Sequence, residues 1–480
     1  MEVAIEAPRS RRQANQHLVD MECRTTGQLE RNGEKRFVFR VSFQYGSSRR
    51  NVITPCTAAL IGGAQALNFV VRSLIAFWYL IPNTGTQIWI SHFDYGGHIQ
   101  RSASDVSEAI PRCPSLRKEL DTFHRSRQED GLNLHSGLSG RSSWILYGNF
   151  RRREASLKLS HVETSRTSEV AIIEQVRESL DILPCLPEAL ASAAGFHDLN
   201  TCHIQQSIGI KLDRKTALDR LPRAIVFDNY LPLVSLTTDM ERFRAAFARL
   251  ICCHAILWLC GIERGDISVG NLMCSKDGTP KLCDYDLSYL SWEKIEIGFT
   301  NTGTLKFMAS ELLTDNAMNG EVQKVYRHDA EAFAWVLLWI LGRYRDGKQL
   351  DQGRLFDSWA EQVSFAEINT KRSTAFTSIM NKKADFPQPL SNNFRGEAFG
   401  FIAKLRGAHL SHESAVVELA AQESFEGPSS NQELEKEIAE FRSAAFITKV
   451  LNTRLIASSE YSGLVKDALK VYMAKENNSQ

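Results

Sequence analysis

The pattern of apolar and polar positions predicts a β-rich part of the chain before about residue 230 and a helical part after it. The runs RFVFRVSF, TQIWISHF and SSWILYGNFRRREASLKLS are short, with the alternating or apolar character of β-strands. Another apolar strand is expected at Ala224 to Phe227, before a connector that contains proline. The first part of the chain should therefore contain sheets.

Apolar residues recur at helical spacing in three segments, the first of which lies within the β-rich part. SEVAIIEQVRESLDIL predicts a helix that ends before Pro184. DMERFRAAFARLICCHAILWLCGI predicts a long helix with one apolar face, on which His254 is best interpreted as a buried core residue with a partner. HDAEAFAWVLLWILG is apolar nearly all round, which predicts the central helix of a helical domain.

Breaks in the pattern predict five segments. We expect a polar leader at 1–35, an N-terminal extension of unknown role at 36–135, a β-rich lobe at 136–230, a helical lobe at 231–410 and a charged helical tail at 411–480. A capping box formed by Ser430 and Glu433 should begin a helix in the tail. The most apolar run, Leu67 to Pro82, is short and contains Arg72, which favours a buried helix or strand pair over a membrane span.

Composition narrows the class of protein. The 480 residues are 43% hydrophobic and 24% charged, as in ordinary globular proteins, and a net charge of +1 gives no basic field for nucleic acid. The ten cysteines include no C-x-x-C pair, so neither a zinc site nor a disulfide framework is expected. With no apolar leader at the N-terminus, we expect an intracellular protein, cytoplasmic or nuclear, that does not bind membranes.

Candidate chemistry lies between Gly261 and Asp284. Asp277-Gly278 predicts a two-residue hairpin turn, and a hairpin centred there places Asn271 opposite Asp284, near Asp266. A carboxamide and a carboxylate that converge in this way suit Mg²⁺, and Asp266 would then be free to accept a hydroxyl proton. The alternative is that Asp266 caps a turn and Asp284 ends a strand. Arg264-Gly265-Asp266 also spells an adhesion tripeptide, which the missing leader and the unpaired cysteines disfavour.

Four motifs carry a resemblance to a known family. DISVGNLM, KLCDYDLS, TGTLKFMASELL and HDAEAF occur in this order between about Lys158 and Leu341. Together they resemble the fungal-type protein kinase family of the protein-kinase-like superfamily. The resemblance implies an α+β, two-lobed protein-kinase-like fold with a small β-rich N-lobe and a larger helical C-lobe, flanked here by the N-terminal extension and the helical tail. It also implies ATP and Mg²⁺ as cofactors.

The resemblance assigns roles to residues in the matching motifs. Asp266 matches the catalytic aspartate, Asn271 the asparagine that binds the second metal, and Asp284 the main metal ligand. Glu311 matches the glutamate that closes the activation segment, and Asp329 the buried aspartate that holds the catalytic-loop backbone.

The nucleotide would bind between the lobes. Lys158 in ASLKLS matches the phosphate-binding lysine, and Glu169 would be its helix partner, with Glu174 as the competing choice. ATP is expected against the connector residues Asn229, Tyr230 and Leu231. Gly137 and Gly140 are what the sequence offers as a glycine-rich loop, and such a sparse loop resembles an ordinary turn as much as a phosphate cradle.

Departures from the family pattern leave the function open between three classes. Arg264-Gly265 stands in place of His-Arg, Tyr285-Asp286 in place of Phe-Gly, and Ser268 in place of the catalytic-loop lysine. The interpretation that the retained residues favour is a kinase that transfers phosphate from Mg-ATP to Ser or Thr hydroxyls of a protein substrate. The alternatives are a pseudokinase acting as a nucleotide-binding or scaffolding module, and a small-molecule phosphotransferase of the aminoglycoside or choline kinase type.

Overall fold

The structure, a computed structural model, describes residues 41–45, 48–52, 87–94, 97–101, 123–125, 133–134, 144–179, 184–193, 220–291, 303–318, 320–359, 365–381, 386–387, 390–426 and 432–479. Gly137, Gly140, the apolar run at 67–82 and Ser430 lie outside these residues. The chain divides into two compact units. Unit 1 is Met1–Ser165 with Glu188–Asn229, and unit 2 is Arg166–Pro187 with Tyr230–Gln480.

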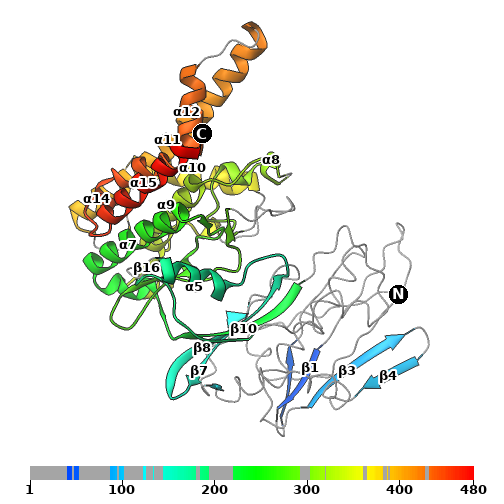
Figure 1. Cartoon of the computed structure of the whole chain (residues 1–480). Coiled ribbons are helices and arrows are strands. Elements are labelled where there is room, and N and C mark those ends of the chain that lie inside the picture. The colour runs from blue at the N-terminus through cyan, green and yellow to red at the C-terminus, as the bar shows by residue number, and fades with distance from the viewer. Residues whose placement is uncertain are drawn as a thin grey trace. The chain divides into compact units, whose positions relative to one another are not determined.

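Unit 1 contains two antiparallel sheets (Figure 1). The first has the order β2-β1-β3-β4, and two of its strands fall in the runs RFVFRVSF and TQIWISHF, where strands are predicted. Its strands are β1 (Val41–Tyr45), β2 (Ser48–Val52), β3 (Gln87–Asp94) and β4 (Gly97–Arg101).

The second sheet of unit 1 has the order β5-β7-β8-β10-β9, with β6 paired to β7. Its strands are β5 (Phe123–Arg125), β6 (Asn133–Leu134), β7 (Trp144–Phe150), β8 (Arg153–Glu163), β9 (Ala189–Ala193) and β10 (Arg220–Asp228). The long strand β8 lies inside the sheet, where its backbone pairs with β7 along one edge and with β10 along the other. The apolar strand predicted at Ala224 to Phe227 is part of β10.

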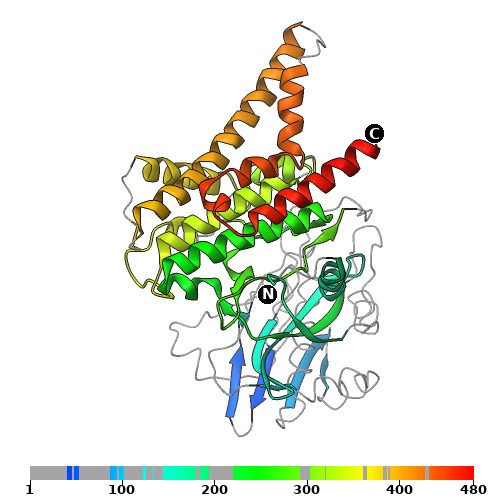
Figure 2. The same ribbon diagram turned by 60° about the vertical axis from the view of Figure 1, so that its left-hand side comes forward.

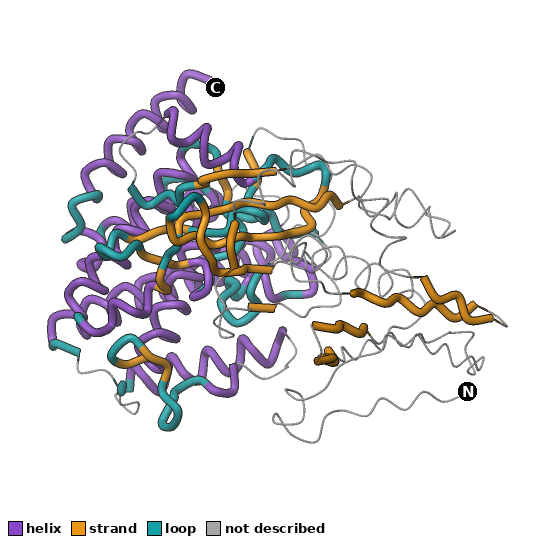
Figure 3. The backbone as a smooth tube through the Cα atoms, turned by 90° about the horizontal axis from the view of Figure 1, so that it is seen from below, coloured by secondary structure: helices purple, strands orange, loops and turns teal. Residues whose placement is uncertain are grey.

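Unit 2 is mainly helical, as the colouring by secondary structure shows (Figure 3). Its α-helices are α5 (Glu169–Ser179), α7 (Met240–Leu259), α8 (Asp315–Met318), α9 (Tyr326–Arg343), α10 (Phe365–Met380), α11 (Asn392–Glu426), α12 (Gln432–Arg442), α13 (Phe446–Leu451), α14 (Arg454–Ala457) and α15 (Ser462–Ser479). Its 3-10 helices are η4 (Leu233–Thr238), η5 (Val269–Asn271), η6 (Glu311–Leu313) and η7 (Asp357–Trp359). Its short strands are β11 (Leu231–Pro232), β12 (Ile262–Glu263), β13 (Leu272–Cys274), β14 (Pro280–Leu282), β15 (Tyr289–Leu290), β16 (Tyr344–Arg345) and β17 (Lys348–Gln349).

Helices α7 and α9 form the core of unit 2. The carboxylate of Asp239 caps α7 by accepting hydrogen bonds from the backbone N–H groups of Glu241 and Arg242. Every residue of α9 is buried, which confirms the expectation of a central helix for this segment. Phe247 of α7 meets Phe333 of α9 edge to face, with ring centroids 5.9 Å apart. Helix α7 also contacts β12 and β14, so this core supports the segment 261–290.

The C-terminal helices cover other surfaces of unit 2. Helices α11 and α12 lie side by side and extend away from the other helices of the unit (Figure 2), with the His412 ring stacked on Phe441. Helix α15 lies along α7, where Tyr472 contacts Trp258. Helix α11 continues through residue 410, at which the sequence pattern divides the helical lobe from the tail, so the five-segment division stays a proposal about organisation.

The described elements together are a mixed α+β arrangement, with antiparallel sheets first and a mostly helical part after them. This agrees with the α+β class expected from the sequence. Among the residues that the structure describes, no helix is long and apolar enough to cross a membrane.

Candidate active site

The hairpin that carries the candidate metal ligands has a register different from the predicted one. Leu272 pairs with Leu282, and the loop has three residues that end at Gly278, whose φ is +91°. The carboxylate of Asp277 accepts a hydrogen bond of 2.8 Å from the backbone N–H of Thr279 and so stabilises this longer loop. The prediction of a two-residue turn at Asp277-Gly278 is wrong, because the glycine takes the left-handed position of a three-residue loop.

The register shift moves each facing pair by one residue. Asn271 lies opposite Cys283, whose backbone N–H donates to the Asn271 carbonyl at 2.9 Å. Asp284 is the next residue along the chain. Asn271 and Asp284 are therefore neighbours at the open end of the hairpin, although not directly opposed.

The carboxylate of Asp266 is held from two directions. Thr304 donates to Oδ1 from its backbone N–H (3.0 Å) and from its hydroxyl (2.9 Å). The amide of Asn271 donates to Oδ2 (3.2 Å) and to the Asp266 carbonyl (3.1 Å). Asn271 uses its Nδ2 in both bonds, so its carboxamide oxygen is the atom it can offer to a metal. A small cavity borders Asp266 and Thr304, and its apolar lining residues are Ile267, Met308, Ala309, Leu312 and Ala332.

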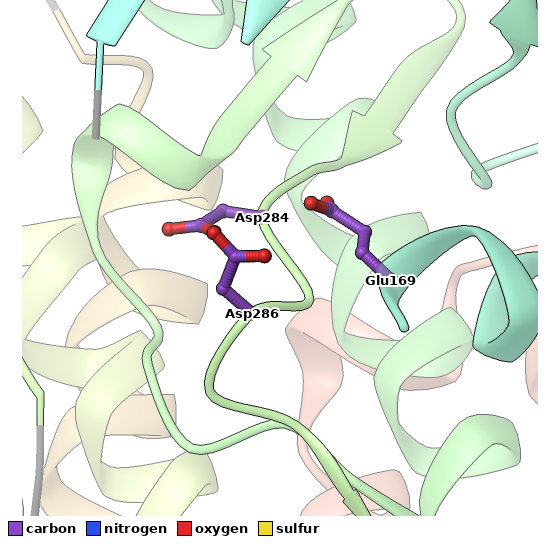
Figure 4. A group of neighbouring side chains, drawn as sticks. All are labelled: Glu169, Asp284 and Asp286. Atoms are coloured by element: carbon purple, nitrogen blue, oxygen red, sulfur yellow. The ribbon is translucent and has the colours of Figure 1, made fainter. Parts of the chain in front are cut away.

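Three carboxylates converge where the hairpin ends at Asp284. Glu169, Asp284 and Asp286 each offer an oxygen, and these oxygens lie within 4.8 Å of one another (Figure 4). Glu169, the first residue of α5, is fully buried and accepts a hydrogen bond of 2.8 Å from the backbone N–H of Tyr285. Asp286 does not appear among the metal ligands expected from the sequence, although its spacing of two residues from Asp284 was a usable signal. All donors are oxygens, which fits Mg²⁺.

Gly265 has a backbone that a side chain would disturb. Its φ is +86°, and a Cβ at this position would lie 2.7 Å from the carbonyl oxygen of Leu287. This explains the glycine directly before Asp266, because both the left-handed backbone and the close approach exclude a side chain. The local backbone thus requires the glycine that stands at position 265, where the family pattern has an arginine.

Asp329 lies in a buried ionic cluster. One oxygen contacts Lys324 Nζ at 2.8 Å and the other His254 Nε2 at 3.0 Å. Burial alone would raise the pKa of Asp329, but Lys324 and His254 outweigh it and lower the pKa. Burial lowers the pKa of His254, so the ring is neutral and donates Nε2–H. Both oxygens thus bond side chains, and the role of holding the catalytic-loop backbone stays a prediction.

Glu311, which the sequence predicts to close the activation segment, lies in a second ionic cluster. It forms an ion pair with Arg327 and accepts a hydrogen bond of 2.7 Å from Nε2 of His328. Nδ1 of the same ring accepts from the backbone N–H of Val325, and burial lowers the His328 pKa well below its usual value, so this ring is also neutral. These contacts anchor the segment on the start of α9.

The remaining site residues lie in unit 1 or at its end. Lys158 is buried on β8, facing Ile145 of β7 and Ile225 of β10 in the ladder. Asn229 donates to Glu154 at 3.3 Å. The proposed pairing of Lys158 with Glu169 stays a prediction, and the competing Glu174 is exposed on α5.

The connector continues into unit 2. Tyr230 is buried, with Lys281 5.7 Å from its ring centroid. Leu231 pairs with Cys274 in the short β11–β13 ladder, and its side chain is 41% exposed.

The catalytic-loop motif, the acidic hairpin end and the activation segment anchored on a central helix indicate the protein-kinase-like class. Residues 113–341 match the family model described as fungal protein kinase. This match confirms, over these residues, the resemblance that the four motifs indicate. Members of this family are kinase-like, so the match suggests a phosphotransferase and implies nucleotide binding. No curated protein matches the chain.

Proposed function

We propose that the protein is a Mg-ATP-dependent protein kinase that phosphorylates Ser or Thr hydroxyls, with a two-lobed fold in which residues 136–230 form the N-lobe and 231–410 the C-lobe. The observation that carries the proposal is the placement of Asp266. Its carboxylate is fixed by Thr304 and Asn271, and the hairpin from Asn271 ends at Asp284. Such an arrangement serves phosphoryl transfer, in which positioning and charge neutralisation supply most of the catalysis.

Each residue has a distinct part in the proposed reaction. Asp266 orients the substrate hydroxyl and accepts its proton through the carboxylate. Asp284 and the carboxamide oxygen of Asn271 would hold Mg²⁺, and Asp286 places a third oxygen within reach. The bound metal would neutralise the charge of the phosphates during transfer. Lys158, a buried cation on β8, would bind the nucleotide phosphates.

The first arm of the test is nucleotide binding. The full chain should bind ATP in a Mg²⁺-dependent way, and Asp284→Asn should weaken Mg-ATP binding and abolish transfer while the melting temperature stays close to that of the unchanged protein. Asp277→Asn is the matched control, because Asp277 lies at the opposite end of the same hairpin. Equal Mg-ATP affinity and transfer in Asp284→Asn would contradict the proposed metal site.

The second arm separates a kinase from its two rivals. Asp266→Ala should lose roughly 10²–10⁴-fold in turnover while ATP still binds, because the carboxylate acts on the hydroxyl. Mg-ATP binding without transfer to any protein, peptide or small alcohol would instead indicate a pseudokinase. Transfer to aminoglycosides or amino alcohols, with none to protein, would indicate a small-molecule phosphotransferase.

A further inference from the structure

Arg264, two residues before Asp266, is a fully buried arginine attached to the segment that contains Asp284. Its side chain has no exposed surface, and its Nη2 donates to the Cys283 carbonyl at 2.5 Å and to the Asp284 carbonyl at 3.3 Å. Burying a guanidinium is costly unless its charge is compensated by strong hydrogen bonds. Nη2 bonds two backbone carbonyls of this segment, whereas Nε and Nη1 are buried without a hydrogen-bond partner, so the hydrogen bonds of the cation are all directed at this segment.

Further contacts hold the same segment. The Arg264 guanidinium lies over the ring of Tyr285, 4.3 Å from the centroid. The hydroxyl of Ser288 donates to the Arg264 carbonyl at 3.2 Å. Arg264 thus contacts residues on both sides of Asp286 through its side chain and its backbone.

The backbone of Asp284 explains why such an anchor is needed. Its φ is +67°, in the left-handed region that residues other than glycine rarely adopt. Such a backbone conformation persists where several neighbouring contacts hold it in place. The Cys283 carbonyl belongs to the peptide before Asp284, and the Asp284 carbonyl to the peptide after it. One nitrogen that bonds both carbonyls therefore restrains φ and ψ of Asp284 together.

We propose that Arg264 is a positioning residue that keeps Asp284 in its left-handed conformation and so directs the Asp284 carboxylate toward the metal. This inference rests on the metal site of the proposed function. It assigns to Arg264 a structural task directed at the metal-binding loop, distinct from binding an activation-segment phosphate. The flat guanidinium lies over the Tyr285 ring while its Nη2 bonds both carbonyls, a combination that the compact ammonium group of lysine does not reproduce.

The test compares Arg264→Lys with Arg242→Lys in the full chain. Arg242 donates to the Asp277 carbonyl at 2.8 Å, which is the same type of contact at the other end of the hairpin. Arg264→Lys should raise the Mn²⁺ concentration for half-saturation, followed by electron paramagnetic resonance in the presence of ATP, by about tenfold or more. ATP affinity without metal should stay within about twofold of the unchanged protein, because Arg264 bonds the backbone of Cys283 and Asp284 and has no proposed contact with the nucleotide. Arg242→Lys should change neither quantity.

Hydrogen exchange gives a readout that needs neither metal nor activity. The backbone N–H groups of Tyr285 and Ser288, which donate to Glu169 and to the Tyr285 carbonyl, should exchange slowly in the unchanged protein. In Arg264→Lys they should exchange about tenfold faster or more, while amides of α7 keep their rates. A higher salt concentration should not restore slow exchange in Arg264→Lys, because the Arg264 contact is buried.

The outcomes separate the two proposals. If the unchanged protein binds no Mn²⁺, the proposed function fails, and hydrogen exchange still decides whether Arg264 holds the segment. If it binds Mn²⁺ and Arg264→Lys shows the same half-saturation and the same exchange, the inference about Arg264 is overturned. If Arg264→Lys does not fold, hydrogen exchange in the unchanged protein and in Tyr285→Leu decides. Fast exchange of the Tyr285 and Ser288 amides in the unchanged protein contradicts the inference. Slow exchange there, together with faster exchange in Tyr285→Leu, supports it.

Discussion

Thr304 donates two hydrogen bonds to the same oxygen of Asp266, one from its backbone N–H and one from its hydroxyl. The second oxygen is bonded by Asn271. The activation segment and the catalytic loop are thus joined at the carboxylate that the proposed reaction uses. The orientation of Asp266 therefore depends on a threonine that lies 38 residues further along the chain.

Changing Thr304→Val should lower turnover by about tenfold, because the hydroxyl bond to Asp266 is lost while the backbone bond remains. The affinity for ATP should not change. The measurement is steady-state kinetics at saturating ATP, and Thr304→Ser should restore the rate. Thr370→Val, which removes a helix-surface hydroxyl on α10, is the control. Equal losses in Thr304→Val and Thr370→Val would contradict a role for the hydroxyl.

Gly265→Ala should destabilise the protein by about 1–3 kcal/mol, because the new Cβ meets the Leu287 carbonyl oxygen and the backbone is left-handed. Gly270→Ala in the same loop is the control, since its nearest neighbour is the Ser268 hydroxyl at 4.0 Å. Urea unfolding of the three proteins measures the difference. A Gly265→Ala protein as stable as Gly270→Ala would show that the loop adapts freely.

Activity should not require phosphorylation of the activation segment. Gly265 has no side chain to bind a phosphate, and Arg264 is buried against the Cys283 and Asp284 carbonyls. Phosphatase-treated protein and a Thr300→Val, Thr302→Val double variant should both turn over at the rate of untreated protein. Thr304 is left unchanged, because it bonds Asp266. A large loss of turnover in both samples, with ATP binding intact, would mean that another cation binds an essential phosphate.

Acid should weaken the protein partly through Glu331. Although burial raises its pKa, the charges of His409 and Arg372 and the hydrogen bond from Ser310 lower it to about 2. A depressed carboxyl pKa stabilises the fold above the unfolded value, and this contribution is lost as the pH falls from about 4.3 toward 2.

The measurement is the free energy of unfolding at pH 5 and at pH 3. It should fall more steeply in the unchanged protein than in Glu331→Gln, by on the order of 1–3 kcal/mol. Gln keeps an acceptor for Ser310 and Trp335, so the difference isolates the charge. Parallel pH profiles would show that Glu331 does not titrate in this range.

The sequence was sufficient to place the long helices, because their apolar spacing extends over several turns. It also placed Asp266, Asn271 and Asp284 near one another, since a turn signal between two strands brings their far ends together. The register failed by one residue, because Asp277-Gly278 suits a two-residue turn and the end of a three-residue loop equally well. That choice is settled by the Asp277 carboxylate bonding the Thr279 N–H, a contact that local pattern does not specify.

The contacts of Arg264 and Asp329 were not accessible to sequence reasoning. Each depends on residues distant in the chain, Cys283 for Arg264 and His254 for Asp329. His254 was expected to have a buried partner, but the apolar face of a helix does not identify it. The sequence shows Asp286 as a departure from the usual glycine. Its part in a cluster of three carboxylates follows only from the position of Glu169 in the structure.

The helices after residue 450 pack against α7, the long helix that precedes the proposed catalytic loop. Tyr472 contacts Trp258, and Arg249 lies over the Tyr461 ring while it pairs with Glu460, so the last helices cover one side of α7. The family match ends at residue 341, well before them. During synthesis on the ribosome, α7 would emerge with that side uncovered until α15 had followed it. Helix α7 would thus gain this support only after residues 462–479 had been synthesised.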